Sequence, residues 1–277
     1  MTRTPGTGPH PGTAAPASAS GARAHHPGCW TEVLRPAAGP GPRVVVFPHA
    51  GGAARRYRDV LAPLPAEAEV VGVTLPGRER RAGLAPHTTL ARAVAGIGAE
   101  LRAPATGRTV FYGHSLGALL ALLVAYRGGV RCDALVVSCS LPGSRAFPRP
   151  ALLGTGAGLT AVLARHGLAA DALEDASLPP ARRALAHDLA LAREALLAVD
   201  GVCVDVPLTA LAGDQDPLVP LAALPLWARL TRGPFRSRPA EGGHFLPFTA
   251  RGRAAVLEEV TASLRPSGRR RDPSLTP

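Results

Sequence analysis

Lysine is missing from this sequence of 277 residues, so arginine supplies every basic side chain except histidine, and the formal net charge is +11. Uniform arginine, together with frequent alanine, glycine and proline, is typical of a GC-rich genome. Part of the positive charge therefore reflects codon usage. The basic residues are scattered, aromatic residues make up only 4% of the chain, and no nucleic-acid-binding motif is present. These shortages argue against a nucleic acid partner, and we expect none.

Long apolar runs and cysteine motifs are scarce as well. No stretch approaches the ~18 consecutive apolar residues of a transmembrane helix, and residues 1–28 lack the apolar core of a secretory signal. Neither a zinc-binding nor a redox pattern fits the spacing of the four cysteines Cys29, Cys132, Cys139 and Cys203. We therefore expect free thiols, a cytoplasmic location, no membrane partner and no metal.

A serine flanked by glycines lies in the most informative stretch of the chain. Four β-prone residues, 109–112, precede Gly113-His114-Ser115-Leu116-Gly117, and an apolar run over 118–125 follows. Strand, Gly-x-Ser-x-Gly and helix in this order are typical of the nucleophile elbow of α/β-hydrolases, where a sharp turn lifts the serine hydroxyl out of the sheet. The flanking strand and helix favour this interpretation over an ordinary strand-to-helix turn.

Strands and helices alternate along most of the chain. Strand-like runs occupy 43–47, 69–75, 109–112, 134–138, 206–212 and 235–238. Helical patterns occupy 53–61, 89–101, 118–125, 221–231 and 249–264. The alternation predicts an α/β fold of the α/β-hydrolase type, with a mostly parallel central sheet flanked by helices.

The length and the 46% hydrophobic content predict one domain, over 41–266. Residues 1–40 cannot bury a core, so we expect a disordered N-terminal arm, attached at its end through Trp30, Val33 and Leu34. A second disordered tail is expected at 267–277. Both ends are therefore predicted to lie outside the folded domain.

The segment 141–199 interrupts the alternation, since it contains no convincing strand. Helical patterns appear at 159–166, near Leu173 and at 185–197. A helical insertion downstream of the serine predicts a mobile lid over the site. We expect Gly154, Gly156 and Gly158 to form a flexible loop that acts as its hinge.

A serine nucleophile needs a histidine base, and the base needs an acid that fixes its tautomer. In this fold the acid and then the histidine follow later strands. The chain offers Asp214 and Asp216 after the 206–212 strand, and His244 after the 235–238 strand. We favour Asp216 because it occupies the fourth position of Gly-x-x-Asp-x-x-Val, and we expect Asp214 to shape the turn.

His244 is the only one of the nine histidines that follows the acid, so we expect it to be the base. His49 and His114 lie beside the predicted site, where they suit loop geometry or substrate binding. The backbone N–H groups of Ala50 and Leu116 are the expected oxyanion donors. The other histidines are interpreted as surface or lid residues: His10, His25, His26, His87, His166 and His187.

Five motifs together resemble the type II thioesterases, which are stand-alone α/β-hydrolases of polyketide synthase and non-ribosomal peptide synthetase systems. The first two of the motifs given below distinguish this family far better than the serine motif does. The motifs are Phe47-Pro48-His49-Ala50-Gly51-Gly52, Leu75-Pro76-Gly77-Arg78-Glu79-Arg80, Gly113-His114-Ser115-Leu116-Gly117, Gly213-Asp214-Gln215-Asp216-Pro217 and Gly242-Gly243-His244-Phe245.

The resemblance covers roughly residues 30–264, and residues 178–188 are similar to the lid segment of that family. It implies a serine thioesterase with the triad Ser115, Asp216 and His244, and with Ala50 and Leu116 as oxyanion donors. The implied substrate is an acyl group on the phosphopantetheine arm of an acyl or peptidyl carrier protein. The implied role is editing or housekeeping, and no cofactor is needed.

Two other functions stay open from the sequence. The fold could serve an oxygen-ester hydrolase or a cyclising release enzyme, or it could be a non-catalytic binding module, although the intact Ser–Asp–His order argues against the last. For an acidic carrier partner, the expected docking surface consists of arginines that lie within or shortly after two of the motifs. These are Arg55, Arg56, Arg78, Arg80 and Arg81. The alternative is that they are solvated residues without a partner.

Overall fold

The computed structural model describes Met1 and residues 29–265, except 104, 149 and 170. Most of the expected N-terminal arm (2–28) and the whole expected tail (267–277) lie outside the described residues. In the part that is described, no helix is long and apolar enough to cross a membrane.

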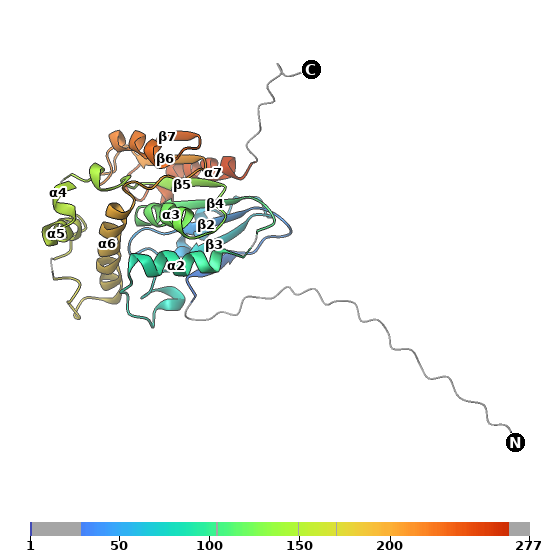
Figure 1. The fold of residues 1–277 in the computed structure, drawn as a ribbon, viewed down its shortest axis with the longest axis horizontal. Helices are drawn as coiled ribbons and strands as arrows, with labels where there is room; N and C mark the ends of the chain where they lie inside the picture. Colours follow the sequence, from blue (N-terminus) through green and yellow to red (C-terminus); the bar gives the residue numbers. More distant parts are fainter. Residues whose placement is uncertain (2–28, 104, 149, 170, 266–277) are drawn as a thin grey trace, which may run out of the picture.

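A seven-stranded sheet forms the centre of the molecule, in the order β1-β3-β2-β4-β5-β6-β7 (Figure 1). All neighbours run parallel except β1 and β3, which are antiparallel. This confirms the predicted fold class. The strands are β1 (Thr31–Arg35), β2 (Arg43–Phe47), β3 (Glu69–Val73), β4 (Thr109–His114), β5 (Ala134–Ser138), β6 (Leu208–Gly213) and β7 (Phe235–Ala240).

Strand β1 corrects the expectation that the arm is disordered up to residue 40. The start of this strand is held by Glu100, which accepts the backbone N–H groups of Thr31 and of Trp30 just before it, at 2.8 and 2.7 Å. Trp30 is buried, and the guanidinium of Arg81 lies over its ring at 3.8 Å. An edge strand with one exposed side is short and carries little periodicity, so the local sequence did not identify it.

Helices cover both faces of the sheet. Successive strand residues point to opposite faces, and both faces carry apolar side chains that must be buried. Val45 and Phe47 of β2 pack in the cluster that includes α2 (Leu90–Leu101) and α3 (Leu116–Arg127). Val44 and Val46 pack on the other face. That second face is covered by α1 (Tyr57–Val60) and α7 (Ala250–Leu264).

The 141–199 insertion is helical, and the described residues within it contain no strand. Figure 1 shows α6 between the sheet and the pair α4 and α5, which stand at one end of the molecule. The glycine run does not form the expected loop, because Gly156 and Gly158 belong to α5, whose N-terminus is capped by the Thr155 hydroxyl. The helices are α4 (Pro150–Leu153), α5 (Gly156–Ala164) and α6 (Pro180–Ala198).

Within the residues that the structure describes, five 3₁₀ helices complete the fold. One of them replaces the α-helix expected at 221–231, and Pro225 inside it removes a backbone donor. The five are η1 (Ala54–Arg56), η2 (Glu79–Arg81), η3 (Ser144–Ala146), η4 (Leu221–Leu230) and η5 (Leu246–Phe248).

Candidate active site

Ser115 lies on a sharp turn between β4 and α3. Its φ and ψ angles are 55° and −119°, a conformation that non-glycine residues rarely adopt, and its N–H donates to the carbonyl of Ser138 at 2.9 Å. Gly113 and Gly117 allow the close approach that this turn requires. A Cβ at Gly117 would lie 1.9 Å from the Phe47 carbonyl oxygen, and one at Gly113 would lie 2.5 Å from Ala118.

The structure brings Ser115, His244 and Asp216 together from the loops after β4, β7 and β6. The Nε2 atom of His244 is 3.0 Å from the Ser115 hydroxyl, and its Nδ1 atom is 2.9 Å from Oδ2 of Asp216. The side chains of His244 and Asp216 are largely buried, at 10% and 0% exposure. The three groups form a continuous hydrogen-bonded chain with the contacts that a serine, a base and an orienting acid require.

The two aspartates of the β6 loop differ in their contacts. Oδ1 of Asp216 accepts the N–H groups of Leu218 and Val219, at 2.8 and 3.2 Å, which leaves Oδ2 directed at His244. Asp214 instead is exposed and accepts the N–H of Gly242 at 3.0 Å, which ties the two loops together. Of the two carboxylates, only Asp216 has a hydrogen bond to His244 among the contacts of the described residues.

A cavity of about 80 Å³ opens beside Ser115. Ala50 and Leu116, the expected oxyanion donors, both line it. Leu116 is the first residue of α3, and the first N–H groups of a helix have no partner within the helix, so they are available to an anion.

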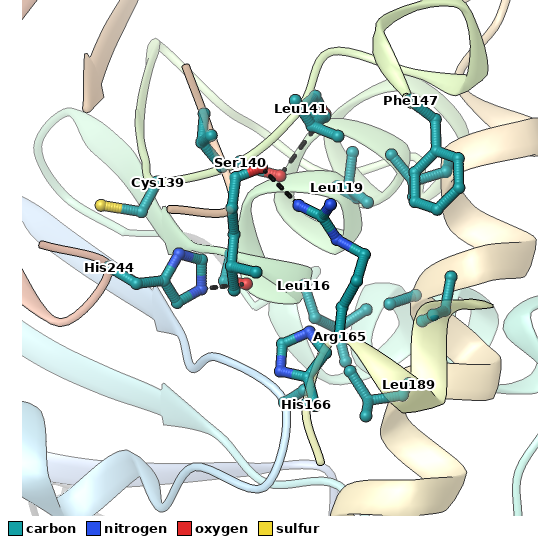
Figure 2. A pocket seen from close by; sticks show the side chains of 17 residues that line it. Leu116, Leu119, Cys139, Ser140, Leu141, Phe147, Arg165, His166, Leu189 and His244 are labelled. Atoms are coloured by element: carbon teal, nitrogen blue, oxygen red, sulfur yellow. Dashed lines mark hydrogen bonds between the residues drawn. The ribbon is translucent and has the colours of Figure 1, made fainter. Parts of the chain in front are cut away.

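The insertion supplies the opposite wall of this cavity. Figure 2 shows the guanidinium of Arg165 directed toward Ser140 and the ring of His166 below it, with Phe147 and Leu189 further along the wall. Sequence reasoning assigned His166 only to the surface or the lid. Burial, followed by the charges of His244 and Arg165, lowers the pKa of His166 to about 4, so its ring is neutral near pH 7. Helical periodicity alone could not show which face of the insertion meets the serine.

His49 and His114 do not line the cavity. His114 is completely buried and His49 is 8% exposed, so their placement does not support the expected contact with substrate. Tyr57, which sequence reasoning did not single out, lies between them. Its hydroxyl is 2.8 Å from Nδ1 of His49 and 2.7 Å from Nδ1 of His114.

The directions of these hydrogen bonds follow from the protonation states. Burial, and then the Arg56 charge, lower the pKa of His49 to about 3, while burial holds the pKa of His114 well below its usual value. Nε2 of His114 lies 2.8 Å from the His244 carbonyl, which can only accept, so this nitrogen carries the proton. Tyr57 therefore donates to His114, and His49 donates to Tyr57. The histidines support the loops from behind the site.

Three of the five expected docking arginines point inward. Arg78 binds Asp188, and its side chain is only 10% exposed. Arg80 binds Glu32 at 3.0 Å, and Arg81 is buried against Trp30. The expectation of a docking surface is therefore wrong for these three, whose charges are used within the fold. Arg55 and Arg56 remain at the surface.

Comparison with known proteins identifies the family to which the chain is related. Residues 42–264 match the family model described as "Thioesterase domain". The chain is 34% identical over 243 residues to a "Probable cadicidin biosynthesis thioesterase" from Streptomyces griseus, across 86% of this chain and 66% of that protein. It is 33% identical over 224 residues to "Thioesterase PikA5" from Streptomyces venezuelae, across 79% of this chain and 80% of that protein.

Solved structures give the same result. The type II thioesterase BorB from the borrelidin biosynthetic cluster matches with a TM-score of 0.67 and 30% identity, over 85% of this chain and 96% of its own. RedJ, a thioesterase from the prodiginine pathway of Streptomyces coelicolor, matches with a TM-score of 0.61 and 28% identity, over 83% and 97% of the two chains.

Proposed function

The chain belongs to the thioesterase family, and on that premise we propose that it hydrolyses acyl thioesters with Ser115 as nucleophile, His244 as base and Asp216 as the acid that orients His244. The observation that carries the proposal is the continuous chain of contacts, at 3.0 and 2.9 Å, from the serine hydroxyl through the imidazole to the carboxylate. A non-catalytic binding module would have no need for this arrangement.

The reaction then proceeds in two halves. His244 removes the proton of the Ser115 hydroxyl as the oxygen attacks the thioester carbonyl, and the N–H groups of Ala50 and Leu116 stabilise the resulting oxyanion. Collapse of this intermediate expels the thiol, which takes the proton from His244, and leaves an acyl-enzyme. A water molecule, deprotonated by His244, attacks the acyl-enzyme and releases the carboxylic acid.

The proposed substrate is a short acyl group on the phosphopantetheine arm of an acyl or peptidyl carrier protein. Two observations support it. Relatives are named as a cadicidin biosynthesis thioesterase and as a type II thioesterase of a borrelidin biosynthetic cluster, and the cavity beside Ser115 is small and mostly apolar in its lining. Removing such groups from a synthase is the editing role that we assign to this chain. An oxygen-ester hydrolase or a cyclising enzyme would use the same triad, but the relatives favour the thioesterase.

The experiment measures the release of acetyl and propionyl groups from a phosphopantetheinylated carrier protein by intact-mass spectrometry. Ser115→Ala should lower turnover by several orders of magnitude and keep the wild-type melting temperature, because triad residues act as a unit. A fluorophosphonate should label the wild type and leave Ser115→Ala unlabelled. Near-normal hydrolysis by the variant would refute the mechanism, whereas cleavage of oxygen esters alone would refute the substrate.

A further inference from the structure

A buried ion pair connects helix α6 to the segments that follow β2 and β3. The side chains of Arg78 and Asp188 are 10% and 2% exposed. Two charge-assisted hydrogen bonds join them, from Nη1 to Oδ2 at 2.5 Å and from Nη2 to Oδ1 at 2.7 Å. Neither residue belongs to the proposed triad, and neither lines the cavity.

Both partners also bind the backbone of the loop after β2. Oδ2 of Asp188 accepts the N–H of Gly51 at 2.7 Å, and Nη1 of Arg78 donates to the carbonyl of Gly52 at 3.2 Å. These contacts hold the two residues that directly follow Ala50, whose N–H is the proposed oxyanion donor. The ion pair therefore fixes the position of this loop at two points.

The loop itself has little freedom to compensate for the loss of these contacts. Gly51 has a φ of 72°, in the left-handed region that favours glycine. A Cβ on Gly51 would lie 3.3 Å from the Leu185 side chain of α6, so helix and loop are in close contact. The N–H of Gly52 donates to the His49 carbonyl at 2.8 Å, which closes the turn around Ala50.

We propose that Asp188 and Arg78 are positioning residues for the oxyanion hole: they hold the 50–52 loop so that the N–H of Ala50 points at the developing oxyanion. The inference rests on the proposed acyl-transfer function. Oxyanion donors act effectively only when they are fixed before the reaction. Because Arg78 neutralises the carboxylate, the loop gains a strong acceptor without a net negative charge beside the oxyanion.

One consequence concerns the insertion. The expected mobile lid covers 141–199, but α6 carries Asp188 and packs on α3 as well as on the loop. Helix α6 is therefore a fixed part of the catalytic site. If part of the insertion moves as a lid, only the residues before α6 can do so without disturbing the oxyanion loop.

The test replaces both partners by apolar side chains of similar size, Arg78→Met together with Asp188→Leu, in the full-length chain. Such an exchange often preserves stability, because neither charge is left alone in the interior. The matched control is Arg238→Met with Glu259→Leu. Glu259 of α7 is 3% exposed and pairs with Arg238 of β7 at 2.9 Å. The control variant therefore removes a similarly buried carboxylate that does not contact the loop.

The principal readout is the hydrolysis of p-nitrophenyl acetate, with an acetylated carrier protein as second substrate. For the Arg78/Asp188 variant we expect kcat to fall about 10–100-fold and KM to change less than about twofold, since the lost interaction acts in the transition state. An aryl trifluoromethyl ketone, whose adduct with Ser115 places an oxyanion in the same hole, should bind more weakly by the same factor. The form of the pH profile should be unchanged, and the control variant should keep wild-type kinetics.

A folded Arg78/Asp188 variant with wild-type kcat overturns the proposal, and so does a loss of kcat without weaker ketone binding. If that variant fails to fold, Asp188→Asn decides the question. Its amide can still accept from Gly51 but cannot balance Arg78, so kcat should fall about 3–10-fold. Wild-type kcat in a folded Asp188→Asn variant would again overturn the inference. A different outcome concerns the unmodified enzyme. If it hydrolyses p-nitrophenyl acetate but not the carrier thioester, the result counts against the proposed substrate and not against this inference.

Discussion

The Nε2 atom of His114 donates to the backbone carbonyl of His244 across 2.8 Å, although 130 residues separate the two histidines. The other nitrogen of His114 accepts from Tyr57, so both ends of the buried ring are bound. His114 therefore holds the backbone of the proposed base from behind, and this contact gives the residue before Ser115 a structural role.

Replacing this ring tests that role. His114→Leu leaves the His244 carbonyl and the Tyr57 hydroxyl without their partner, at a cost of about 1–3 kcal/mol for each unsatisfied group. We expect a lower midpoint in urea denaturation and a lower kcat, because the His244 loop loses a support. His87→Leu is the control, since His87 is exposed and should change stability by less than about 0.5 kcal/mol. Equal stabilities of the two variants would contradict the assignment.

The low pKa of His49 predicts a pH-dependent stability with a definite sign. The folded chain protonates His49 only near pH 3, whereas an unfolded histidine does so near 6.5. Between these values the unfolded state binds the extra proton, so the contribution of His49 is complete above pH 6.5 and is lost as the pH falls toward 3. The loss is about 1.4 kcal/mol per pH unit. Urea denaturation from pH 6 to pH 4 should give a shallower dependence for His49→Gln than for the wild type, and identical slopes would refute the prediction.

The two aspartates of the β6 loop should respond differently to loss of charge. Asp216→Asn removes the acceptor that selects the tautomer of His244, and kcat should fall by up to about 10⁴-fold. Asp214→Asn retains an oxygen that can accept from Gly242, so kcat should change little. Steady-state hydrolysis of one thioester by both variants measures the difference. The opposite order of losses would reassign the acid.

The wall formed by α6 should set the length of the acyl group. Leu196→Ala enlarges the cavity and should raise kcat/KM for hexanoyl relative to acetyl thioesters, whereas Ala192→Leu should lower that ratio. One methylene in an apolar pocket is worth only about 1–3 kcal/mol, so neighbouring chain lengths should differ modestly in the wild type. Leu197→Ala is the matched control, because Leu197 is 39% exposed on the same helix and does not line the cavity. An unchanged chain-length profile in both cavity variants would place the acyl group elsewhere.

Charge reversal should distinguish arginines that stabilise the fold from arginines that bind a carrier protein, because the two kinds of variant should lose activity on different substrates. Arg80→Glu places a second carboxylate beside Glu32, which is only 6% exposed, so stability and activity on every substrate should fall. Arg56→Glu alters an exposed residue whose guanidinium lies over the ring of Phe248, four residues after His244, and we expect a lower kcat/KM for an acylated carrier protein only, with the difference screened by salt. The comparison uses the same acyl group on pantetheine. Equal losses on both substrates for Arg56→Glu would remove Arg56 from the docking surface.

Local sequence determined the elements that build the site. β-prone runs predicted all six parallel strands, and β2 and β5 have the expected bounds. Gly113 and Gly117 marked the turn at Ser115, because side chains at these positions would collide with the backbone. The spacing of the loop after β6 selected Asp216. These features depend on neighbours in the chain, so periodicity and turn chemistry are sufficient to find them.

Tertiary structure decided the contacts between distant segments. The pairing of Arg78 with Asp188, the bond from His114 to the His244 carbonyl and the antiparallel position of β1 join residues that no local pattern connects. The sequence showed arginines within and after a family motif, but only packing showed that three of them point inward. A charge or a ring has no fixed role until the fold places its partner, because hydrogen bonds and ion pairs act over about 3 Å of space and not over distance along the chain.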